Sequence, residues 1–459
     1  MNPLEAARAG LRGEPAWLVG GAVRDRLLGR ATTDLDIALA GDPETAARAI
    51  ARAAGGTAFE LSGAFGAWRV VGRGHAWHVD IVGLREGDLA ADLAARDFTV
   101  NAMAEPLAGG ELVDPHGGRA DLEAKRLRMV SAQGLAEDPL RTLRAGRLAN
   151  ELELTLDPET ADEVRRRAPE LEAVAAERVF QELKRIVAGE RPVAGIELLD
   201  ELGLTAAVLP ELGALRGVEQ NVFHHRDVHG HTLEVLAAVA RLESGADALG
   251  EHAGAVRDLL AEPLADELTR GGAMRFAALL HDAAKPATRG TRPDGRVTFV
   301  GHDAEGAALA KRVIRRLRGS QRLGDYVAAL TLHHLRLGFL VHERPLERRA
   351  VWRYLQATKP YSADVTVFTV ADRLATRGRN AEPAIAAHLE LAREVLGPAL
   401  AGRRAPKPEP LVRGDELAAE LGVQGPRIGR LLAELEEAQY AGEIRTREDA
   451  LRLARSLLA

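Results

Sequence analysis

The sequence predicts an α+β protein, with a mixed sheet and helices in its N-terminal part and an all-α body after it. Residues 15–130 contain short apolar runs bounded by glycine-rich turns, the pattern of strands and short helices. From Pro139 onward apolar residues recur at intervals of three and four, as on the buried face of a helix. Aromatic residues make up only 4% of the chain, which favours helices over an all-β fold.

The individual elements follow from these runs. We expect strands at 16–19, 36–39, 68–71 and 78–82, and helices at about 22–29, 43–54 and 88–94. Residues 283–301 are predicted to be a loop with a small hairpin. The proline-rich segment 403–410 is predicted to be a stiff linker before a small helical tail.

Composition limits the classes of function. The chain is 46% apolar and 28% charged, which is ordinary for a globular protein. It has no cysteine, so disulfides and thiolate metal sites are excluded. We find neither a signal peptide nor a membrane span and expect a cytoplasmic protein without a membrane partner. The net charge of −6 does not indicate nucleic-acid binding, but a basic groove can lie on an acidic protein.

Two glycines and two carboxylates form the first group of chemistry-bearing residues. Gly20 and Gly21 lie between a strand and a helix, where the backbone can approach a phosphate and Arg24 could reach the same anion. Asp34 and Asp36 are two residues apart on a strand, so both carboxylates face the same way. Mg²⁺ bound there would relieve their repulsion and could activate a hydroxyl for attack on a nucleotide. Taken alone, each motif is more simply a turn or a solvated acid pair.

Segments 18–29 and 33–37 together resemble the head of the bacterial-type (class II) CCA-adding tRNA nucleotidyltransferases and bacterial poly(A) polymerases. The resemblance implies a polymerase-β-like nucleotidyltransferase head and, as partners, CTP, ATP and the 3′ end of tRNA. It implies that Asp34 and Asp36 are the catalytic carboxylates that hold Mg²⁺. Gly20, Gly21 and Arg24 would hold the triphosphate.

Two further motifs carry this resemblance downstream. Residues 96–101 are similar to the family's ribose-reading motif, which implies that Arg96, Asp97 and Asn101 contact the nucleotide. This chain has Ala95 where the family usually has another arginine.

Residues 137–141 match the family's EDxxR motif. Read directly, Asp138 before a proline indicates a helix N-cap, and Arg141 would lie within one turn of both acids. The resemblance implies that Asp138 and Arg141 read the incoming base while Glu137 orients Arg141. Arg144 would add a phosphate or ribose contact.

The segment 81–95, between the Asp80 strand and Arg96, is short. Full CCA-adding enzymes usually carry a longer flexible loop there, linked to the switch from CTP to ATP, and relatives without it typically add only CC. The sequence therefore favours addition of CC over complete CCA.

A second group of chemistry-bearing residues lies in the helical part. The ordered series H…HD…D resembles the HD phosphohydrolase superfamily. The resemblance implies that a divalent transition metal or Mg²⁺ is held by His231, His281, Asp282 and Asp372. His302, His333 and His334 could bind a second metal or a substrate phosphate, and Lys285 could also meet a phosphate.

These resemblances imply four domains: a nucleotidyltransferase head (1–136), a helical neck and RNA-binding region (137–215), an HD domain (216–400) and a helical tail (401–459). Segment 177–183 resembles the family's neck-helix motif, which supports the head. Three other interpretations remain open: a bacterial poly(A) polymerase, an HD phosphohydrolase or alarmone-type enzyme, and an RNA-binding relative with inactive sites. Oligomeric state is also open.

Overall fold

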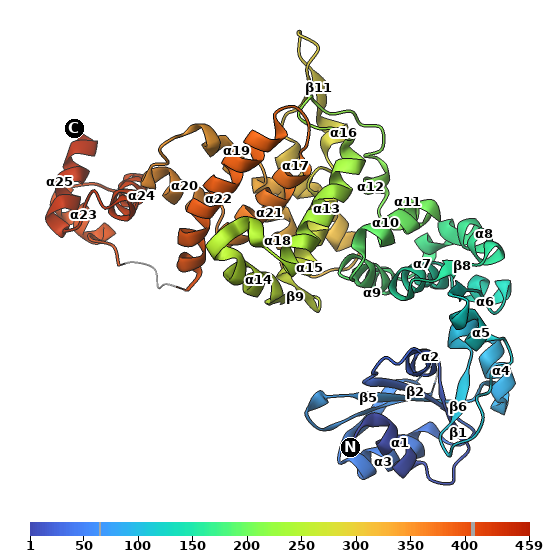
Figure 1. Ribbon diagram of the computed structural model, residues 1–459. Coiled ribbons are helices and arrows are strands. Elements are labelled where there is room, and N and C mark those ends of the chain that lie inside the picture. The colour runs from blue at the N-terminus through green and yellow to red at the C-terminus, as the bar shows by residue number, and fades with distance from the viewer. Residues whose placement is uncertain (64–65, 405–408) are drawn as a thin grey trace. The chain divides into compact units, whose positions relative to one another are not determined.

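The computed structural model describes residues 1–63, 66–404 and 409–459 of the chain (Figure 1). It contains two compact units. The first comprises residues 1–186 and 194–208, and the second comprises 187–193 and 209–459. Residues 405–408 of the expected linker lie outside the described residues.

The N-terminal part of the first unit is built on a mixed six-stranded sheet in the order β3-β4-β5-β2-β1-β6. Its strands are β1 (Ala16–Val19), β2 (Asp34–Leu39), β3 (Thr57–Ser62), β4 (Ala67–Val71), β5 (His78–Gly83) and β6 (Ala104–Pro106). Only β2 and β5 pair in parallel. Its helices are α1 (Pro3–Gly10), α2 (Gly21–Leu27), α3 (Pro43–Ala54) and α4 (Leu89–Ala94). The mixed sheet with helices is confirmed.

The sequence did not predict β3, β6 or α1. β3 is an edge strand without a buried residue, so it lacks the apolar run that marked the other strands. β6 is short and ends in Pro106, which cannot donate a ladder hydrogen bond. α1 is capped by Asn2, whose side chain accepts from the Glu5 amide.

The rest of the first unit is helical. Its elements are α5 (Gly118–Glu123), α6 (Ala132–Glu137), α7 (Leu140–Leu152), α8 (Pro158–Arg167), α9 (Ala176–Val187), α10 (Pro192–Glu201) and α11 (Leu204–Val208), with a short parallel pair of β7 (Arg126–Leu127) and β8 (Thr155–Leu156). α9 is strongly amphipathic, as helices that bury one face are.

The second unit is almost wholly helical, as predicted. Its helices are α12 (Pro210–Gly213), α13 (Val228–Ser244), α14 (Ala253–Ala261), α15 (Arg270–Leu280), α16 (Lys285–Thr288), α17 (His302–Arg316), α18 (Gln321–His333), α19 (Arg336–Phe339), α20 (Arg348–Ala357), α21 (Ser362–Ala375), α22 (Ala381–Arg404), α23 (Gly414–Leu421), α24 (Pro426–Ala441) and α25 (Arg447–Leu458). Two small antiparallel pairs interrupt them: β9 (Pro263–Ala265) with β10 (Leu268–Thr269), and β11 (Arg289–Thr291) with β12 (Val297–Phe299). The latter is the predicted hairpin. Among the described residues, no helix combines the length and apolar character that a membrane crossing needs.

Candidate functional sites in the head and in the helical body

The turn between β1 and α2 brings three sequence motifs together. Gly20 has φ 69° and ψ −142°, a conformation that side chains rarely adopt. A Cβ atom at Gly20 would lie 2.9 Å from Nη1 of Arg96 and 3.2 Å from Oδ2 of Asp36. The glycine therefore lets the turn pass between the two side chains. Arg96 is held from its other side by Asp92, whose Oδ2 accepts from Nη2 at 2.9 Å.

The Asp pair projects from β2 beside two side chains of β5. In the parallel register Asp34 lies opposite His78, and Asp36 lies opposite Asp80. Nδ1 of His78 is 2.9 Å from Oδ1 of Asp34. Burial raises the pKa of Asp36, because it disfavours the charged carboxylate. The negative charge of Asp80 raises this pKa further, while the positive charge of Arg96 opposes the shift.

Asp80 and its partner Arg69 were not among the predicted site residues. The Arg69 guanidinium donates to both carboxylate oxygens of Asp80, at 2.6 and 2.7 Å. The available signal was the alternation of His78 and Asp80, which repeats the spacing of the Asp pair on the neighbouring strand. Carboxylate oxygens are the ligands that Mg²⁺ prefers, so this donor set fits the expected ion.

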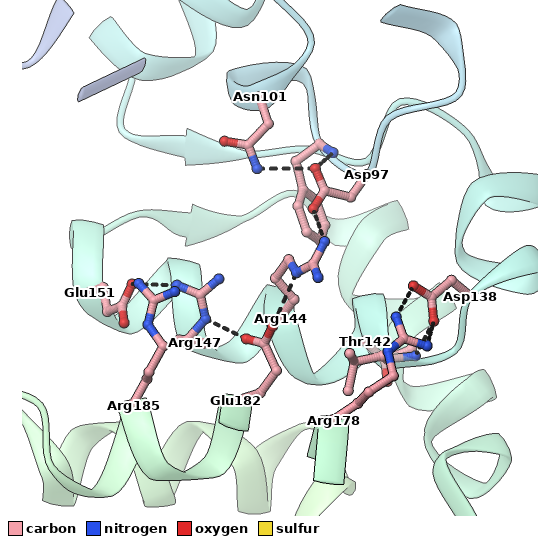
Figure 2. A network of polar contacts seen from close by, with 12 residues as sticks. Asp97, Asn101, Asp138, Thr142, Arg144, Arg147, Glu151, Arg178, Glu182 and Arg185 are labelled. Carbon is pink, nitrogen blue, oxygen red and sulfur yellow. Dashed lines mark hydrogen bonds and ion pairs between the residues drawn. The ribbon is translucent and has the colours of Figure 1, made fainter. Parts of the chain in front are cut away.

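The ribose motif is joined to the phosphate turn by a chain of hydrogen bonds. Nη1 of Arg24 donates to Oδ1 of Asn101 at 2.7 Å, and Nδ2 of Asn101 donates to Oδ1 of Asp97 at 3.0 Å. The other oxygen of Asp97 accepts from Nη1 of Arg144 at 3.1 Å (Figure 2). Burial acts to raise the pKa of Asp97, but Arg144 and Asn101 outweigh it and hold that pKa below its usual value. Thus four of the predicted nucleotide-binding residues form one connected network.

The predicted N-cap at Asp138 is wrong by one residue. α6 ends at Glu137, Asp138 is in an extended conformation, and α7 begins at Leu140 with Pro139 as its N-cap residue. Asp138 still takes part in the capping, because its Oδ1 accepts from the Leu140 amide at 3.3 Å.

Glu137, Asp138 and Arg141 do not form the expected array. Asp138 instead accepts two hydrogen bonds from Arg178 of α9, at 3.2 and 2.8 Å. Arg141 donates through Nη1 to the carbonyl of Gly134 at 3.2 Å. The break between α6 and α7 explains the difference, since the two acids are not on the helix that carries Arg141.

The second site is a buried cluster of imidazoles and carboxylates in the helical body. His231 lies on α13, His281 and Asp282 directly follow α15, and Asp372 lies on α21. Nε2 of His231 is 3.0 Å from Oδ1 of Asp372 and 3.8 Å from Oδ2 of Asp282. Nε2 of His281 is 3.2 Å from the same Asp282 oxygen. The structure thus brings the predicted ligands together.

Two of the further histidine candidates join this cluster. His302 and His334 lie on the other side of Asp282, with their Nε2 atoms 3.5 and 3.9 Å from its Oδ1. The Asp282 carboxylate therefore stands between two groups that could each hold a metal ion. His333 is not part of either group and contacts Arg336.

Hydrogen bonds from Nδ1, the ring nitrogen that faces away from the cluster, orient three of these histidines. Nδ1 of His281, His302 and His334 lies 2.9, 2.6 and 2.6 Å from a backbone carbonyl. A carbonyl only accepts, so each Nδ1 carries a proton, and in the neutral ring the lone pair of Nε2 faces the cluster. Nε2 of His281 and Oδ1 of Asp282 are buried without a hydrogen-bond partner among the described residues, while Oδ2 of Asp282 is ion-paired to Lys285. Such atoms fit a metal centre.

A cavity of about 810 Å³ opens onto this cluster. It is lined by the basic side chains of Lys285, Arg292, Arg296 and Arg379, and two of these arginines belong to the β11–β12 hairpin region. Nζ of Lys285 is 2.7 Å from Oδ2 of Asp282. Cations around a metal-binding cluster favour an anionic ligand such as a phosphate ester.

Three family models match the chain. The poly A polymerase head domain matches residues 16–85 and 82–128, the probable RNA- and SrmB-binding site of polymerase A matches 153–215, and the HD domain matches 228–377.

Relatives match nearly the full length. An A-adding tRNA nucleotidyltransferase from Deinococcus radiodurans is 38% identical, covering 95% of this chain and 94% of the relative. A CC-adding tRNA nucleotidyltransferase from Thermus thermophilus is 37% identical, covering 95% and 92%. Among solved structures, a CCA-adding enzyme in complex with CTP has a TM-score of 0.65 at 20% identity, covering 99% of this chain and 94% of that one. That likeness shows the fold.

Proposed function

This chain belongs to the tRNA nucleotidyltransferase family, the enzymes that build the CCA sequence at the 3′ end of tRNA, and we propose that it adds only the CC part. The alternative of a poly(A) polymerase loses its support, because relatives matched over nearly the whole chain are tRNA enzymes. The alarmone alternative loses its support for the same reason. We place the enzyme in the cytoplasm, where tRNA is matured.

The main support for CC-only addition is that the segment between β5 and Arg96 is folded. It forms a short 3₁₀ turn (Arg85–Gly87) and α4, whose N-cap Asp88 accepts from the Ala91 amide at 3.1 Å. Leu93 is part of a core cluster that includes buried residues of the sheet, and Leu84 and Leu89 pack against this cluster. No part of this segment is left as a long loop that could change the base-reading groups between CTP and ATP. An enzyme that selects only one base needs no such change, and the short form of this segment, typical of CC-adding relatives, favours cytosine as that base.

In the proposed reaction, the head residues bind and align rather than react covalently. Asp34 and Asp36, with Asp80 beside them, would hold Mg²⁺, which supplies activation of the tRNA 3′-hydroxyl and charge stabilisation of the leaving pyrophosphate. Gly20, Gly21 and Arg24 would contact the triphosphate.

The nucleoside would be held by the two downstream motifs. Arg96, Asp97 and Asn101 would hold the ribose. Asp138 would accept from the amino group of cytosine, and Arg141 would donate to the acceptor atoms of its edge.

The test uses two acceptors, a tRNA lacking CCA and a tRNA ending in CC, each supplied with CTP or ATP. We expect CTP to be added to the first acceptor and ATP to neither. Addition of ATP to the tRNA ending in CC, without use of CTP, would identify an A-adding enzyme and contradict the proposal. Addition of both nucleotides would show that the folded segment does not prevent a change of base.

We also propose that the helical body is a metal-dependent phosphoesterase. The supporting observation is the buried cluster in which Nε2 of His281 and Oδ1 of Asp282 have no hydrogen-bond partner among the described residues and which opens onto a basic cavity. Imidazole nitrogens favour a transition metal over Mg²⁺. Hydrolysis of a phosphate ester by protein loaded with Mn²⁺, Co²⁺ or Ni²⁺, and loss of it with a chelator, is the expected result. Absence of hydrolysis with every ion would reject this activity.

A further inference from the structure

Helix α9 presents two charged side chains, Arg178 and Glu182, four residues apart on one face. Arg178 contacts the base-reading motif directly, and Glu182 reaches the ribose motif through Arg144 (Figure 2). Arg178 contacts Asp138, the proposed base-reading carboxylate. Glu182 contacts Arg144, which in turn contacts Asp97 of the ribose motif. One helix face thus holds Asp138 directly and Asp97 through Arg144, although Asp97 belongs to a motif about forty residues earlier in the chain.

The contact on the base side determines where the Asp138 carboxylate points. Asp138 lies at the break between α6 and α7, so no helix fixes its backbone. Its two oxygens accept from Nη1 and Nη2 of Arg178, and one of them also accepts from the Leu140 amide. A two-pronged guanidinium contact fixes the plane of a carboxylate as well as its position. Lone pairs that these donors leave open can accept from the amino group of a base.

The contact on the ribose side passes through Arg144. Its Nε donates to Oε1 of Glu182 at 3.2 Å, and its Nη1 donates to Oδ2 of Asp97 at 3.1 Å. The second oxygen of Glu182 accepts from Nε of Arg147, so the Glu182 side chain is itself held at both oxygens. Asp97 is 6% exposed, and a buried carboxylate without this arginine would lose its main charge partner.

We propose that α9 is a positioning helix for substrate choice, in which Arg178 sets the selection of the base and Glu182, through Arg144, sets the selection of the ribose. This inference rests on the proposed nucleotidyl transfer and goes beyond it by separating two kinds of selectivity. Neither side chain is assigned a contact with the nucleotide. Both act through a residue that touches it.

The experiment measures kcat and KM for CTP, UTP, ATP and dCTP with the full chain, using a tRNA lacking CCA. Arg178→Met is expected to lower the preference for CTP over UTP and ATP by about tenfold while leaving the preference for CTP over dCTP unchanged. Glu182→Gln is expected to do the opposite, lowering the preference for CTP over dCTP by about tenfold. Arg178→Lys keeps the charge but not the two-pronged contact, so it should restore only part of the base preference.

Arg166→Met provides the matched control. Arg166 is an exposed arginine on neighbouring α8, ion-paired to Glu163, and Glu163 keeps a second partner in Arg167. This variant should leave both preferences unchanged. Thermal unfolding of all variants shows whether each is folded, and Arg178→Lys supplies the test if Arg178→Met is not.

Loss of both preferences together in either variant, or no loss in Arg178→Met and Arg178→Lys, would overturn the inference. An unmodified chain that incorporates no CTP would instead reject the proposed function itself. The two failures are therefore distinguishable.

Discussion

The two candidate sites of this chain differ in how complete they are before a substrate arrives. In the head, Asp34 is 64% exposed and contacts His78, while four of the predicted nucleotide-binding side chains, Arg24, Asn101, Asp97 and Arg144, are linked to one another by hydrogen bonds and an ion pair. In the helical body, the side chains of His231, His281 and Asp282 are only 1–2% exposed, and buried ligand atoms among them lack a hydrogen-bond partner. The helical body thus holds a preassembled candidate metal site, whereas the proposed site in the head is an aligned surface that nucleotide and RNA would complete.

The largest effect that separates the two sites is expected from Asp36→Ala. Removing this carboxylate takes away a proposed Mg²⁺ ligand, so nucleotide addition to tRNA should fall by about a thousandfold or more. Hydrolysis of phosphate esters by the helical body should not change. Steady-state assays of both activities on one preparation measure the effect. Normal nucleotide addition by the folded variant would contradict the role given to the Asp pair.

Asp282→Ala is the reciprocal change. Because Asp282 stands between the two histidine groups, its loss should weaken divalent metal binding by at least about a hundredfold, with CTP addition retained. Metal titration followed by elemental analysis of the protein reports the loss. His333→Ala is a suitable control, since His333 belongs to neither group. Unaltered metal content in Asp282→Ala would show that the cluster is not a metal centre.

The smallest effect is expected from the hairpin arginines. Arg292→Ala and Arg296→Ala remove cations from the cavity wall without touching a proposed metal ligand. Each should raise the KM for a phosphate ester several-fold, which corresponds to a loss of about 1 kcal/mol of binding free energy. Both kcat and metal content should stay nearly unchanged. A fall in kcat with unchanged KM would mean that the cavity does not bind the phosphate of the substrate.

The head motifs could be predicted because their chemistry is local. Gly20 and Gly21 stand at a strand-to-helix turn, and alternation along one strand puts Asp34 and Asp36 on the same side. Asp80 was not predicted because its place beside Asp36 depends on the parallel register of β2 and β5, which neither strand encodes alone.

The EDxxR motif shows the opposite case. The sequence spacing suggested a helical array around Arg141, but the chain breaks between α6 and α7 and α9 provides the partner of Asp138 instead. The residues of the HD cluster could be singled out by residue type and order, and the structure brings them together. Their division into two groups around one carboxylate depends on how α13, α15, α17, α18 and α21 pack together.

CC-only addition is best tested by the mass of the product formed from a tRNA lacking CCA when Mg²⁺ and all four nucleotides are supplied together. The folded segment between β5 and Arg96 predicts a single product, extended by CC, that grows no further when more ATP is added. A product extended to CCA, a long A tail, or no extension at all would contradict the account.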